Sequence, residues 1–550
     1  MKRLLPLLAL SLAACGPHST TKVIVFGVDG MDPNFVERHW ADLPALNQLR
    51  TEGSFARLAT TDPPQSPVAW SGFITGLPPA EHGIFDFVHR DPATHEPYLS
   101  ITRTTASHML IPLGPWELPL RPAGIQLLRK GQPFWVPLAE KGIPVSILHM
   151  PANFPPTGTG EQLAGMGTPD LRGTQGTYTL LDHAGEIDLP GPANTLRRDH
   201  APTAAKIRID IDAVNPVARF IVGDQTILLN EGEWSGWLPV EFPLIEHLAS
   251  TRGMIRIFAK QLHPAVSIYI SPINLDPLDP ALPLSNPSRM APDYAKVIGR
   301  YPTVGIPQDT AALRNGVFTL AEFLAHTKDI LNTERRLLNA ALDRFQGGLL
   351  FFYFSSVDQN SHILWGKNEA ELLTYYQGVD EAIANARRRE PTARIIVMSD
   401  HGFAAFDRAV NLNTWLRQEG LHTRAWALGL NALYLTDPAD APEIRRRLLE
   451  LQDPETGKPA ITAVGLVQPA IANKAIAPTL TVGYAPGYRA SWATGLGEVA
   501  PQVFETNTDA WQGDHCIDPA AVPGVLFVSK GPPITASSIQ TLGAAIARLF

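Results

Sequence analysis

Thr21–Val28 reads TKVIVFGV and is followed directly by Asp29 and Gly30. The run is mostly apolar and rich in β-branched residues, a composition typical of a strand buried on both faces of a parallel sheet. Asp29 then stands at the carboxyl end of that strand, the edge at which open α/β sheets place their ligands. The stretch therefore predicts a buried central strand and an acidic group at a functional site.

Two later segments repeat this arrangement. Gly348–Ser355 (GLLFFYFS) leads to Asp358, and Arg394–Met398 (RIIVM) leads to Asp400. The helical patterns that precede these two segments cover Leu320–Arg344 and Ala370–Arg389. Alternation of strands and helices of this kind predicts an α/β fold, a doubly wound and mainly parallel sheet sandwiched by helices.

The middle of the chain has a different pattern. Between Ala204 and Ser271 apolar and polar residues often alternate, as in Lys206–Ile211 (KIRIDI). Alternation with period two is typical of half-solvated antiparallel strands. We therefore predict a β-rich insertion with a long loop, 201–316, whose last part, 272–316, is rich in Pro and Asn. The insertion divides the catalytic core into a first part, 21–200, with cap and loop insertions, and a second part, 317–550.

The amino terminus predicts export. Lys2 and Arg3 precede the short apolar run Leu4–Leu12, and Leu12–Cys15 (LAAC) has the small residues of a cleavage site. A cysteine directly after such a site resembles the lipobox of bacterial lipoproteins; the alternative is an ordinary signal peptide with an incidental cysteine. The apolar run is too short to span a bilayer. We favour a lipoprotein signal segment, 1–15, that is cleaved directly before Cys15, and a lipid anchor on Cys15 as the new terminal residue, which would place the protein at the periplasmic face of a membrane or in the outer membrane.

Composition narrows the class of protein. The chain has 550 residues, of which 45% are hydrophobic, enough for a large core. Its formal charge is -8 and no block of one sign occurs, which argues against a nucleic-acid partner. Because Cys516 is the only cysteine besides Cys15, an acylated Cys15 leaves no pair for an intramolecular disulfide. No feature indicates an oligomeric state.

Five separated segments supply groups suited to metal-dependent hydrolysis. These segments are Asp29, Pro63–Ser71, Asp358–His362, Ser399–Gly402 and Gly513–His515. They combine carboxylate oxygens with imidazole nitrogens, the ligand mix that suits zinc in a hydrolase. Two such ions roughly 4 Å apart can bind the attacking and the leaving oxygen of a phosphoryl transfer at once.

The spacing within two of these segments has a physical logic. Asp358 and His362 are at i and i+4, so one helical turn places both side chains on one face. Asp400 and His401 are adjacent, and a tight loop after a strand lets them approach a metal from different directions. Gly402 is expected to give the backbone the freedom to turn away.

Ser66 is the candidate nucleophile. It stands where an N-cap belongs, Pro67 suits the first helical position, and Val68–Ile74 can form the first turns before Thr75 and Gly76 end them. The amides at a helix N-terminus favour an alkoxide or a phosphate oxygen. A metal bound to the hydroxyl would lower the pKa of Ser66 further, so no histidine base is required.

Each segment taken alone also fits a structural role. An Asp-Gly after a strand forms turns, a Ser-Pro caps helices, and Asp358 with His362 would serve as a surface pair. A single histidine such as His515 is more often structural than a ligand. The argument for a metal site depends on the order of all five segments and on their positions at strand ends.

In these segments the chain resembles the alkaline phosphatase superfamily, specifically its type I phosphodiesterase/nucleotide pyrophosphatase branch. The motifs that carry the resemblance are Gly27–Met31 (GVDGM), Ser66 followed by Thr75-Gly76 and His82–Ile84 (HGI), Asp358 with His362, Asp400–Gly402 (DHG) and His515. His82 lies within a motif but is not a family ligand, so we expect it to pack.

The resemblance implies a ligand set and a mechanism. Asp358, His362 and His515 would hold one divalent metal ion, with zinc the expected metal. The second ion would be held by Asp29, Asp400, His401 and the hydroxyl oxygen of Ser66. Hydrolysis would then pass through a phosphoseryl intermediate that a metal-bound water attacks in turn.

Two departures concern the substrate. Nucleotide pyrophosphatases usually carry threonine at the position of Ser66, and asparagine shortly after the HGI segment, where this chain reads Phe85–Phe87 (FDF). An ionised Asp86 there would repel phosphate. Arg90 is the candidate replacement for binding the phosphoryl oxygens, although a solvated arginine is the plainer interpretation.

Several rival functions share the fold. A sulfatase is rejected because Ser66 is followed by Pro67 and has Trp70 where the maturation motif needs arginine. A phosphosugar mutase would find little substrate outside the cytoplasm. A non-catalytic surface binding module and a transferase remain open. We favour a hydrolase of small-molecule phosphate esters, and a phosphodiesterase over a phosphomonoesterase because no third-metal ligand set is present.

Overall fold

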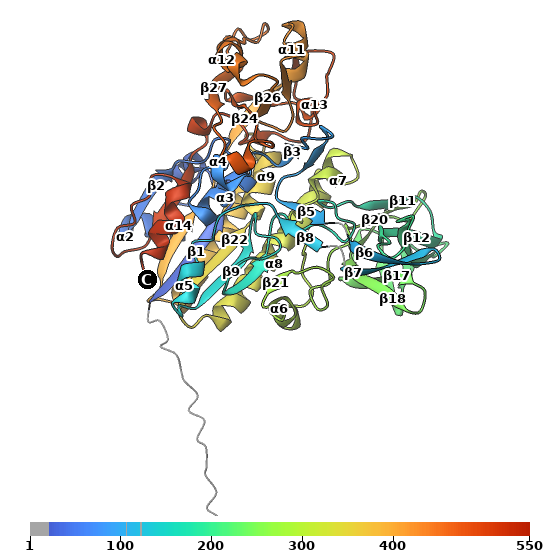
Figure 1. The fold of residues 1–550 in the computed structure, drawn as a ribbon. Coiled ribbons are helices and arrows are strands. Elements are labelled where there is room, and N and C mark those ends of the chain that lie inside the picture. The colour runs from blue at the N-terminus through green and yellow to red at the C-terminus, as the bar shows by residue number, and fades with distance from the viewer. Residues whose placement is uncertain (1–20, 106, 122–123) are drawn as a thin grey trace, which may run out of the picture.

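A computed structural model describes residues 21–105, 107–121 and 124–550, and the predicted signal segment with Cys15 lies outside them. The centre is an eight-stranded sheet (Figure 1). In sheet order its strands are β2 (Ser54–Leu58), β32 (Gly524–Val528), β23 (Arg394–Met398), β1 (Lys22–Val28), β22 (Gly348–Phe354), β9 (Val145–Met150), β10 (Glu161–Ala164) and β21 (Ser285–Asn286). The five strands from β23 to β10 pair in parallel, while β32 and β21 run against them. The predicted mainly parallel sheet is confirmed.

Helices cover both faces of this sheet, as the doubly wound prediction requires. In β1, Val23 and Val25 pack into one apolar cluster and Ile24 and Phe26 into the other, because successive side chains of a strand point to opposite faces. The first cluster includes residues of α3 (Ser66–Thr75), α5 (Val136–Glu140) and α14 (Ile539–Ala547). The second includes residues of α2 (Pro44–Glu52), α6 (Met290–Ile298), α8 (Leu320–Arg344) and α10 (Glu369–Arg389).

The two long helices lie close to their predicted bounds. α8 covers the predicted interval, and α10 begins one residue earlier than predicted. At the start of α8, Thr319 and Glu322 form a capping box, in which each side chain accepts from the backbone of the other residue.

The β-rich part forms separate small sheets with their own apolar core. In β13 (Pro202–Ile211) exposed and buried residues alternate, as the sequence pattern predicts. The strands extend beyond the predicted start at 201, because β12 pairs with β13 along most of its length. The other strands are β11 (Thr179–Leu181), β12 (Gly185–Ala193), β14 (Val217–Val222), β15 (Gln225–Asn230), β16 (Glu233–Trp234), β17 (Leu238–Ile245), β18 (Ala249–Ile255), β19 (Ile257–Gln261) and β20 (Ser267–Ile270).

The expectation that 272–316 is a long loop is wrong. This segment supplies the edge strand β21, which pairs with β10, and the helix α6, which packs on α8. It also contains α7 (Thr310–Arg314). Its prolines interrupt the apolar periodicity from which a helix is recognised, although Tyr294 and Ala295 of α6 are buried.

The segment 317–550 is not one continuous piece of the core. After β23 the chain leaves the main sheet and builds a C-terminal subdomain with a separate core before it returns as β32 (Figure 1, upper part). The strands of the C-terminal subdomain are β24 (Ala404–Val410), β25 (Ala425–Ala427), β26 (Ala432–Leu435), β27 (Ile461–Leu466), β28 (Leu480–Tyr484), β29 (Gly487–Ala490), β30 (Phe504–Thr506) and β31 (Gly513–Asp514). Its helices include α11 (Leu412–Gln418), α12 (Ala441–Leu449) and α13 (Trp492–Gly495).

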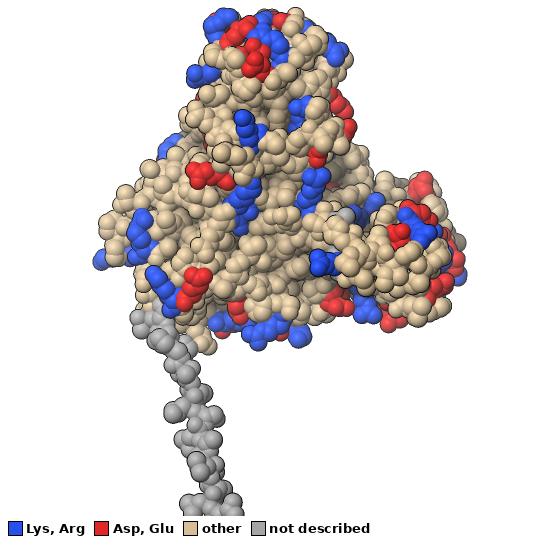
Figure 2. Space-filling view, viewed as in Figure 1, with Lys and Arg blue, Asp and Glu red and all other residues tan. Residues whose placement is uncertain are grey.

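Antiparallel pairs of short strands lie between α3 and α5 in the described chain. They are β3–β4 (Val88–Arg90, Pro97–Leu99), β5–β8 (Thr102–Thr105, Gly124–Leu127) and β6–β7 (His108–Leu113, Trp116–Arg121). On the face shown in Figure 2, acidic and basic side chains are interspersed rather than gathered by sign. Across the described part of the chain, every helix is too short or too polar to cross a membrane.

Candidate active site

The predicted site residues converge at the carboxyl edge of the parallel strands. Asp29 follows β1, and the helix α9 (Ser356–Leu364), which carries Asp358 and His362, follows its neighbour β22. Asp400 and His401 follow β23 on the other side of β1. His515 joins them from the C-terminal subdomain, directly after β31. Parallel strands thus bring together groups that are hundreds of residues apart in the sequence.

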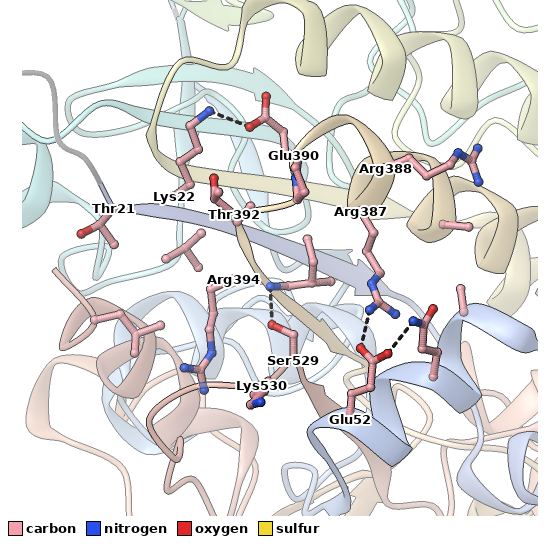
Figure 3. Close-up of a pocket in the computed structure, with 18 of the residues that line it drawn as sticks. Thr21, Lys22, Glu52, Arg387, Arg388, Glu390, Thr392, Arg394, Ser529 and Lys530 are labelled. Carbon is pink, nitrogen blue, oxygen red and sulfur yellow. Dashed lines mark hydrogen bonds and ion pairs between the residues drawn. The ribbon is translucent and has the colours of Figure 1, made fainter.

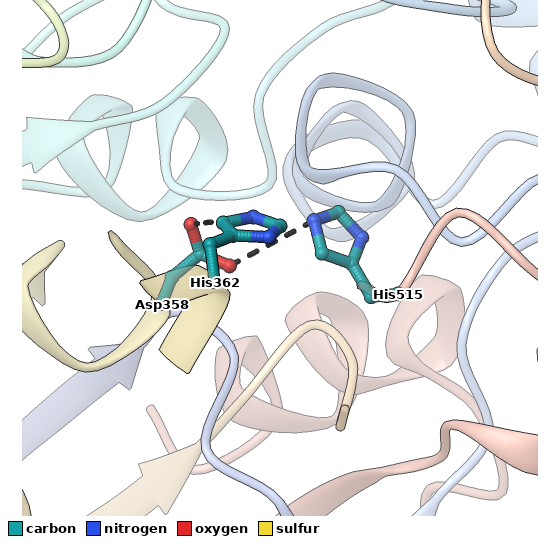
Figure 4. Close-up of side chains that lie close together, drawn as sticks. All are labelled: Asp358, His362 and His515. Carbon is teal, nitrogen blue, oxygen red and sulfur yellow. Dashed lines mark ion pairs between the residues drawn. The ribbon is translucent and has the colours of Figure 1, made fainter. Parts of the chain in front are cut away.

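Asp358, His362 and His515 form the first group of candidate metal ligands (Figure 4). The Nε2 atom of His362 is 3.6 Å from Asp358 Oδ2, and His515 Nε2 is 3.7 Å from Asp358 Oδ1. The predicted placement of Asp358 and His362 on one helical face is observed in α9. All three side chains are buried.

Asp29, Asp400 and His401 surround the Ser66 hydroxyl. Ser66 Oγ is 3.3 Å from Asp29 Oδ1 and 3.1 Å from His401 Nε2. His401 Nε2 is 3.4 Å from Asp29 Oδ1 and 3.2 Å from Asp400 Oδ2. The His401 ring stacks on His515 with ring centroids 3.5 Å apart, so the two groups of ligands are direct neighbours.

The helix of Ser66 begins one residue earlier than the sequence indicates. Ser66 is the first helical residue of α3, and Gln65, with an extended backbone, holds the cap position. The prediction of Ser66 as N-cap is therefore wrong, although a shift of one residue is within the usual uncertainty of helix ends. The hydroxyl still lies at the N-terminus of α3, and the predicted end at Gly76 is observed, with φ of 71°.

Histidine hydrogen bonds show that a cation fits between these groups. His362, His401 and His515 each place Nδ1 at 2.7–3.1 Å from a backbone carbonyl, of Gly513, Gly402 and Pro64 respectively. A carbonyl oxygen only accepts, so Nδ1 carries the proton and Nε2 has a free lone pair. Each Nε2 therefore directs its lone pair toward a carboxylate oxygen, an arrangement that a metal ion would satisfy.

The carboxylates of Asp358 and Asp400 also indicate that a cation fits here. Asp358 Oδ1 and Asp400 Oδ2 are buried and accept no hydrogen bond within the described residues. Burial and repulsion by Asp29 raise the pKa of Asp358 and of Asp400 well above the usual value. Burial also lowers the pKa of His362 to about 3, which keeps its imidazole neutral and able to bind a metal. The residues present therefore fit divalent cations.

Other buried groups hold these ligands in place. Asp29 Oδ2 accepts hydrogen bonds from Tyr353 Oη at 2.6 Å and from Trp70 Nε1 at 3.0 Å. Glu334 of α8 accepts from the backbone N–H and the hydroxyl of Ser355 and from the hydroxyl of Ser356, where α9 begins. Tyr353 and Glu334 thus connect the core of the fold to two of the predicted ligand positions.

Gly402 has a role different from the predicted one. Its φ is not positive, so the turn does not require glycine for conformational freedom. A Cβ at this position would instead meet Asp32 Oδ2 at 2.5 Å and the backbone oxygen of Pro523 at 2.7 Å. Close packing behind His401 is therefore the reason for glycine.

The structure gives Asp86 and Arg90 different surroundings from those expected. Asp86 is buried, and its Oδ2 accepts from Gln65 Nε2 and from the backbone N–H groups of Leu430 and Asn431. Burial raises the pKa of Asp86 to about 6. Asp86 therefore anchors the cap of α3 to the C-terminal subdomain. Arg90 lies on β3 with its guanidinium 5.8 Å from the centroid of the Tyr434 ring, and it is not among the described residues that line the pocket beside Ser66.

That pocket has a volume of about 290 Å³ and also contacts Asp358, His362 and His515. Arg489 and Asp514 line one wall, and sequence reasoning assigned neither a role. No pattern could have singled out Arg489, because its segment lies in the C-terminal subdomain that the sequence did not predict. The main apolar side chains of the pocket are Phe87, Ile306, Leu430, Trp492, Leu496 and Trp511.

A larger groove, of about 800 Å³, lies at the opposite edge of the sheet, where β1 and β23 begin (Figure 3). Two ion pairs lie in it: Lys22 Nζ is 2.6 Å from Glu390, and Arg387 is 2.8 Å from Glu52. Ligands of open α/β sheets bind at the carboxyl ends of the strands, so the smaller pocket beside Ser66 is the candidate active site.

Comparison with known proteins identifies the family. The family described as type I phosphodiesterase/nucleotide pyrophosphatase matches residues 23–210 and 258–490, and the chain belongs to it. The unmatched interval 211–257 lies inside the β-rich part. The chain is accordingly a hydrolase of phosphate esters, of a family that depends on metal ions. No curated protein matches the sequence.

Solved structures of low identity also resemble the chain. Phosphonoacetate hydrolase from Sinorhizobium meliloti 1021, in complex with phosphonoformate, is 13% identical, with 96% of each chain covered and a TM-score of 0.48. Murine ectonucleotide pyrophosphatase/phosphodiesterase 5 is 11% identical, with 96% of this chain and 95% of that chain covered and a TM-score of 0.45.

Proposed function

We propose that the chain is a phosphodiesterase that uses two zinc ions and Ser66 as its nucleophile. The observation that carries this proposal is the position of the Ser66 hydroxyl, at the start of α3 and within 3.3 Å of both Asp29 and His401. Asp358, His362 and His515 would hold one ion, and Asp29, Asp400, His401 and Ser66 the other. The ions would stabilise negative charge on the oxygens of the reacting phosphoryl group.

The chain's own residues divide the work of the reaction. Ser66 Oγ gives up its proton as it bonds to phosphorus, the bond from phosphorus to the leaving oxygen breaks, that oxygen takes up a proton and departs as an alcohol, and a phosphoseryl group forms. Water then attacks phosphorus, which releases the phosphate product and returns a proton to Ser66. The backbone amides at the N-terminus of α3 favour negative charge at both steps. The carbonyls that bind Nδ1 of the three histidines fix ring orientation.

The apolar pocket supports a diester as substrate. A diester has a second organic group, and the tryptophans and leucines that line the pocket offer that group an apolar surface to contact. A monoester dianion would instead call for an extra arginine or a third metal. Among the described residues, potential metal ligands also lie close together at Asp514, His515 and Cys516, but His515 already belongs to the first group.

We also propose that the protein is exported and anchored through Cys15. The described chain begins next to β1, whose first residue, Lys22, lies at the sheet edge opposite the active site. An anchor joined to that edge would leave the pocket open on the side away from the anchor. Metabolic labelling with a radioactive fatty acid tests this, since Cys15→Ser should abolish the label and leave soluble protein.

The test of the catalytic proposal compares two substrates and two variants. Zinc-loaded protein should hydrolyse bis(4-nitrophenyl) phosphate faster than 4-nitrophenyl phosphate. Ser66→Ala should abolish turnover while metal content stays near two zinc ions per chain. Ser71→Ala is the matched control, because Ser71 is also buried in α3 but its hydroxyl donates to the Pro67 carbonyl. Wild-type rates in Ser66→Ala would exclude Ser66 as the nucleophile, and a strong monoester preference would exclude the diester.

A further inference from the structure

One wall of the pocket holds an arginine whose hydrogen-bonding capacity is largely unused. Arg489, in β29, is only 3% exposed and lines the same pocket as Ser66 and His515. Its Nε lies 3.0 Å from Asp514 Oδ2, but Nε and Nη2 make no hydrogen bond with any described residue. Leaving buried donors of a charged group unsatisfied is costly, so an acceptor from outside the chain is expected here.

Asp514 does not account for this arginine. Asp514 Oδ1 already accepts from the backbone N–H groups of His515 and Cys516, both at 2.7 Å, and Oδ2 accepts from Trp511 Nε1 at 3.3 Å. A guanidinium that served only this carboxylate would be expected to form two parallel hydrogen bonds with it. The observed ion pair lacks that geometry, which leaves most of the donors of Arg489 for another partner.

Aromatic rings hold the guanidinium in position. Its central carbon is 4.2 Å from the centroid of Trp492 and 5.3 Å from that of Phe406. Trp492 is fixed in turn by a hydrogen bond from Nε1 to Asp509, and Arg314 contacts the same ring at 4.2 Å. A guanidinium oriented by stacking needs little ordering when a ligand binds, which favours recognition of an anion.

The rest of the pocket indicates what accompanies that anion. Leu430, Leu496 and Trp511 line it together with Arg489. Such walls suit an aromatic or aliphatic body, and their low polarity strengthens the attraction between Arg489 and a negative charge. We propose that Arg489 binds an oxyanion of the substrate, and that the substrates are phosphate esters whose organic group is aromatic or apolar. The ester part of this statement rests on the proposed function.

Binding of phenylphosphonate tests the role of Arg489 without any reaction. This compound joins an oxyanion to an aromatic ring and has no ester bond to cleave. Isothermal titration of zinc-loaded protein should show roughly 10- to 100-fold weaker binding in Arg489→Met, the range expected for a lost hydrogen bond between charged groups. Arg256→Met is the matched control, because Arg256 also stacks on a tryptophan, Trp234, and pairs with a carboxylate, Asp329, but is not among the residues that line the pocket beside Ser66. Its affinity should stay within about threefold of wild type.

A second probe distinguishes two sources of the oxyanion. 3-Carboxyphenylphosphonate adds an acidic substituent on the ring. If Arg489 binds the phosphoryl oxygens, Arg489→Met weakens both probes by the same factor. If it binds a substituent, wild type prefers the carboxylated probe and the variant loses that preference. Affinity for both probes within threefold of wild type in Arg489→Met, or an equal loss in Arg256→Met, would overturn the inference.

Arg489→Lys keeps the test valid if Arg489→Met does not fold. Lysine retains the charge opposite Asp514 but lacks the planar fork, so it should fold, keep its zinc and still bind phenylphosphonate at least tenfold more weakly than wild type. Wild-type affinity in this variant would contradict recognition by the guanidinium. Because phenylphosphonate binding needs no turnover, failure to hydrolyse any ester would refute the proposed function while this inference is judged separately.

Discussion

The hydroxyl of Tyr353 offers a sharp test of how the fold supports the metal site. Tyr353 is the sixth residue of β22 and is buried. Its hydroxyl donates to Asp29 Oδ2 at 2.6 Å, whereas Asp29 Oδ1 faces Ser66 and His401. Burial and the neighbouring Asp29 raise the pKa of Tyr353 well above its usual value, so the donor stays protonated. Tyr353→Phe removes this donor and little else.

The expected loss of zinc affinity in Tyr353→Phe depends on the hydrogen bonds that Asp29 keeps. In the variant, Asp29 Oδ2 still accepts from Trp70 Nε1 at 3.0 Å, so this oxygen loses one of its two donors rather than both. A hydrogen bond to a charged group contributes about 1.5–3 kcal/mol. Removing a group that orients a metal ligand typically weakens metal binding by roughly 10- to 100-fold. We therefore expect zinc affinity at the Asp29 site to fall by about that factor.

Competition with a chromophoric chelator measures this affinity directly. The matched control is Tyr375→Phe, which also removes a buried tyrosine hydroxyl, in this case one bonded to Thr327 Oγ1 at 2.7 Å and not to Asp29. Both variants should lose some unfolding free energy, but only Tyr353→Phe should release zinc at lower chelator concentration. Equal zinc affinity in Tyr353→Phe and wild type would refute the view that Tyr353 positions Asp29.

Three further predictions concern buried charge and close packing. Burial raises the pKa of Glu334 from 4.5 to about 7, so the protonated side chain stabilises the folded state below pH 4.5 and that contribution is lost as the pH rises through about 7. Between pH 4.5 and about 7, urea titrations should show that wild type loses about 3 kcal/mol more unfolding free energy than Glu334→Gln. Equal losses in the two proteins would contradict this prediction. Gly402→Ala should cost about 1–3 kcal/mol because its Cβ meets Asp32 and Pro523, whereas Gly236→Ala, with nothing within 4 Å, should be neutral in the same titration. Removal of metal by a chelator should lower the melting temperature and zinc should restore it; a melting temperature unaffected by chelator would be evidence against bound cations.

The sequence predicted those parts of the structure that depend on local apolar pattern. The runs before Asp29, Asp358 and Asp400 are each apolar enough to be recognised as buried strands, and all three are strands of the main sheet. Because parallel strands share one carboxyl edge, the meeting of these acids followed from the strands alone. The helices α8 and α10 were equally accessible, since each presents a long apolar stripe with a clear start signal.

Prediction failed where short elements owe their structure to distant contacts. The strands of the C-terminal subdomain have only two to seven residues each, too few for an alternation of apolar and polar residues to be recognised in the sequence. Asp86 reads from the sequence as a charge that would repel phosphate, yet its partners are Gln65, Leu430 and Asn431, two of them more than 300 residues away. The role of Gly402 likewise depends on Pro523, which only the folded chain brings near. Such contacts have no local signature.

The C-terminal subdomain completes the site as well as covering it. Asp358 and His362 belong to the core helix α9, but His515 and Arg489 both come from this subdomain. A cation shared by Asp358, His362 and His515 would therefore join two separately packed units, and binding it would stabilise their contact by the same free energy with which the contact favours the cation. The wall that recognises the substrate would then be in place only when the metal ligands are. Coupling of this kind explains why a hydrolase would build its nucleophile on the core and its substrate wall on a subdomain: each becomes useful only when the other is correctly positioned.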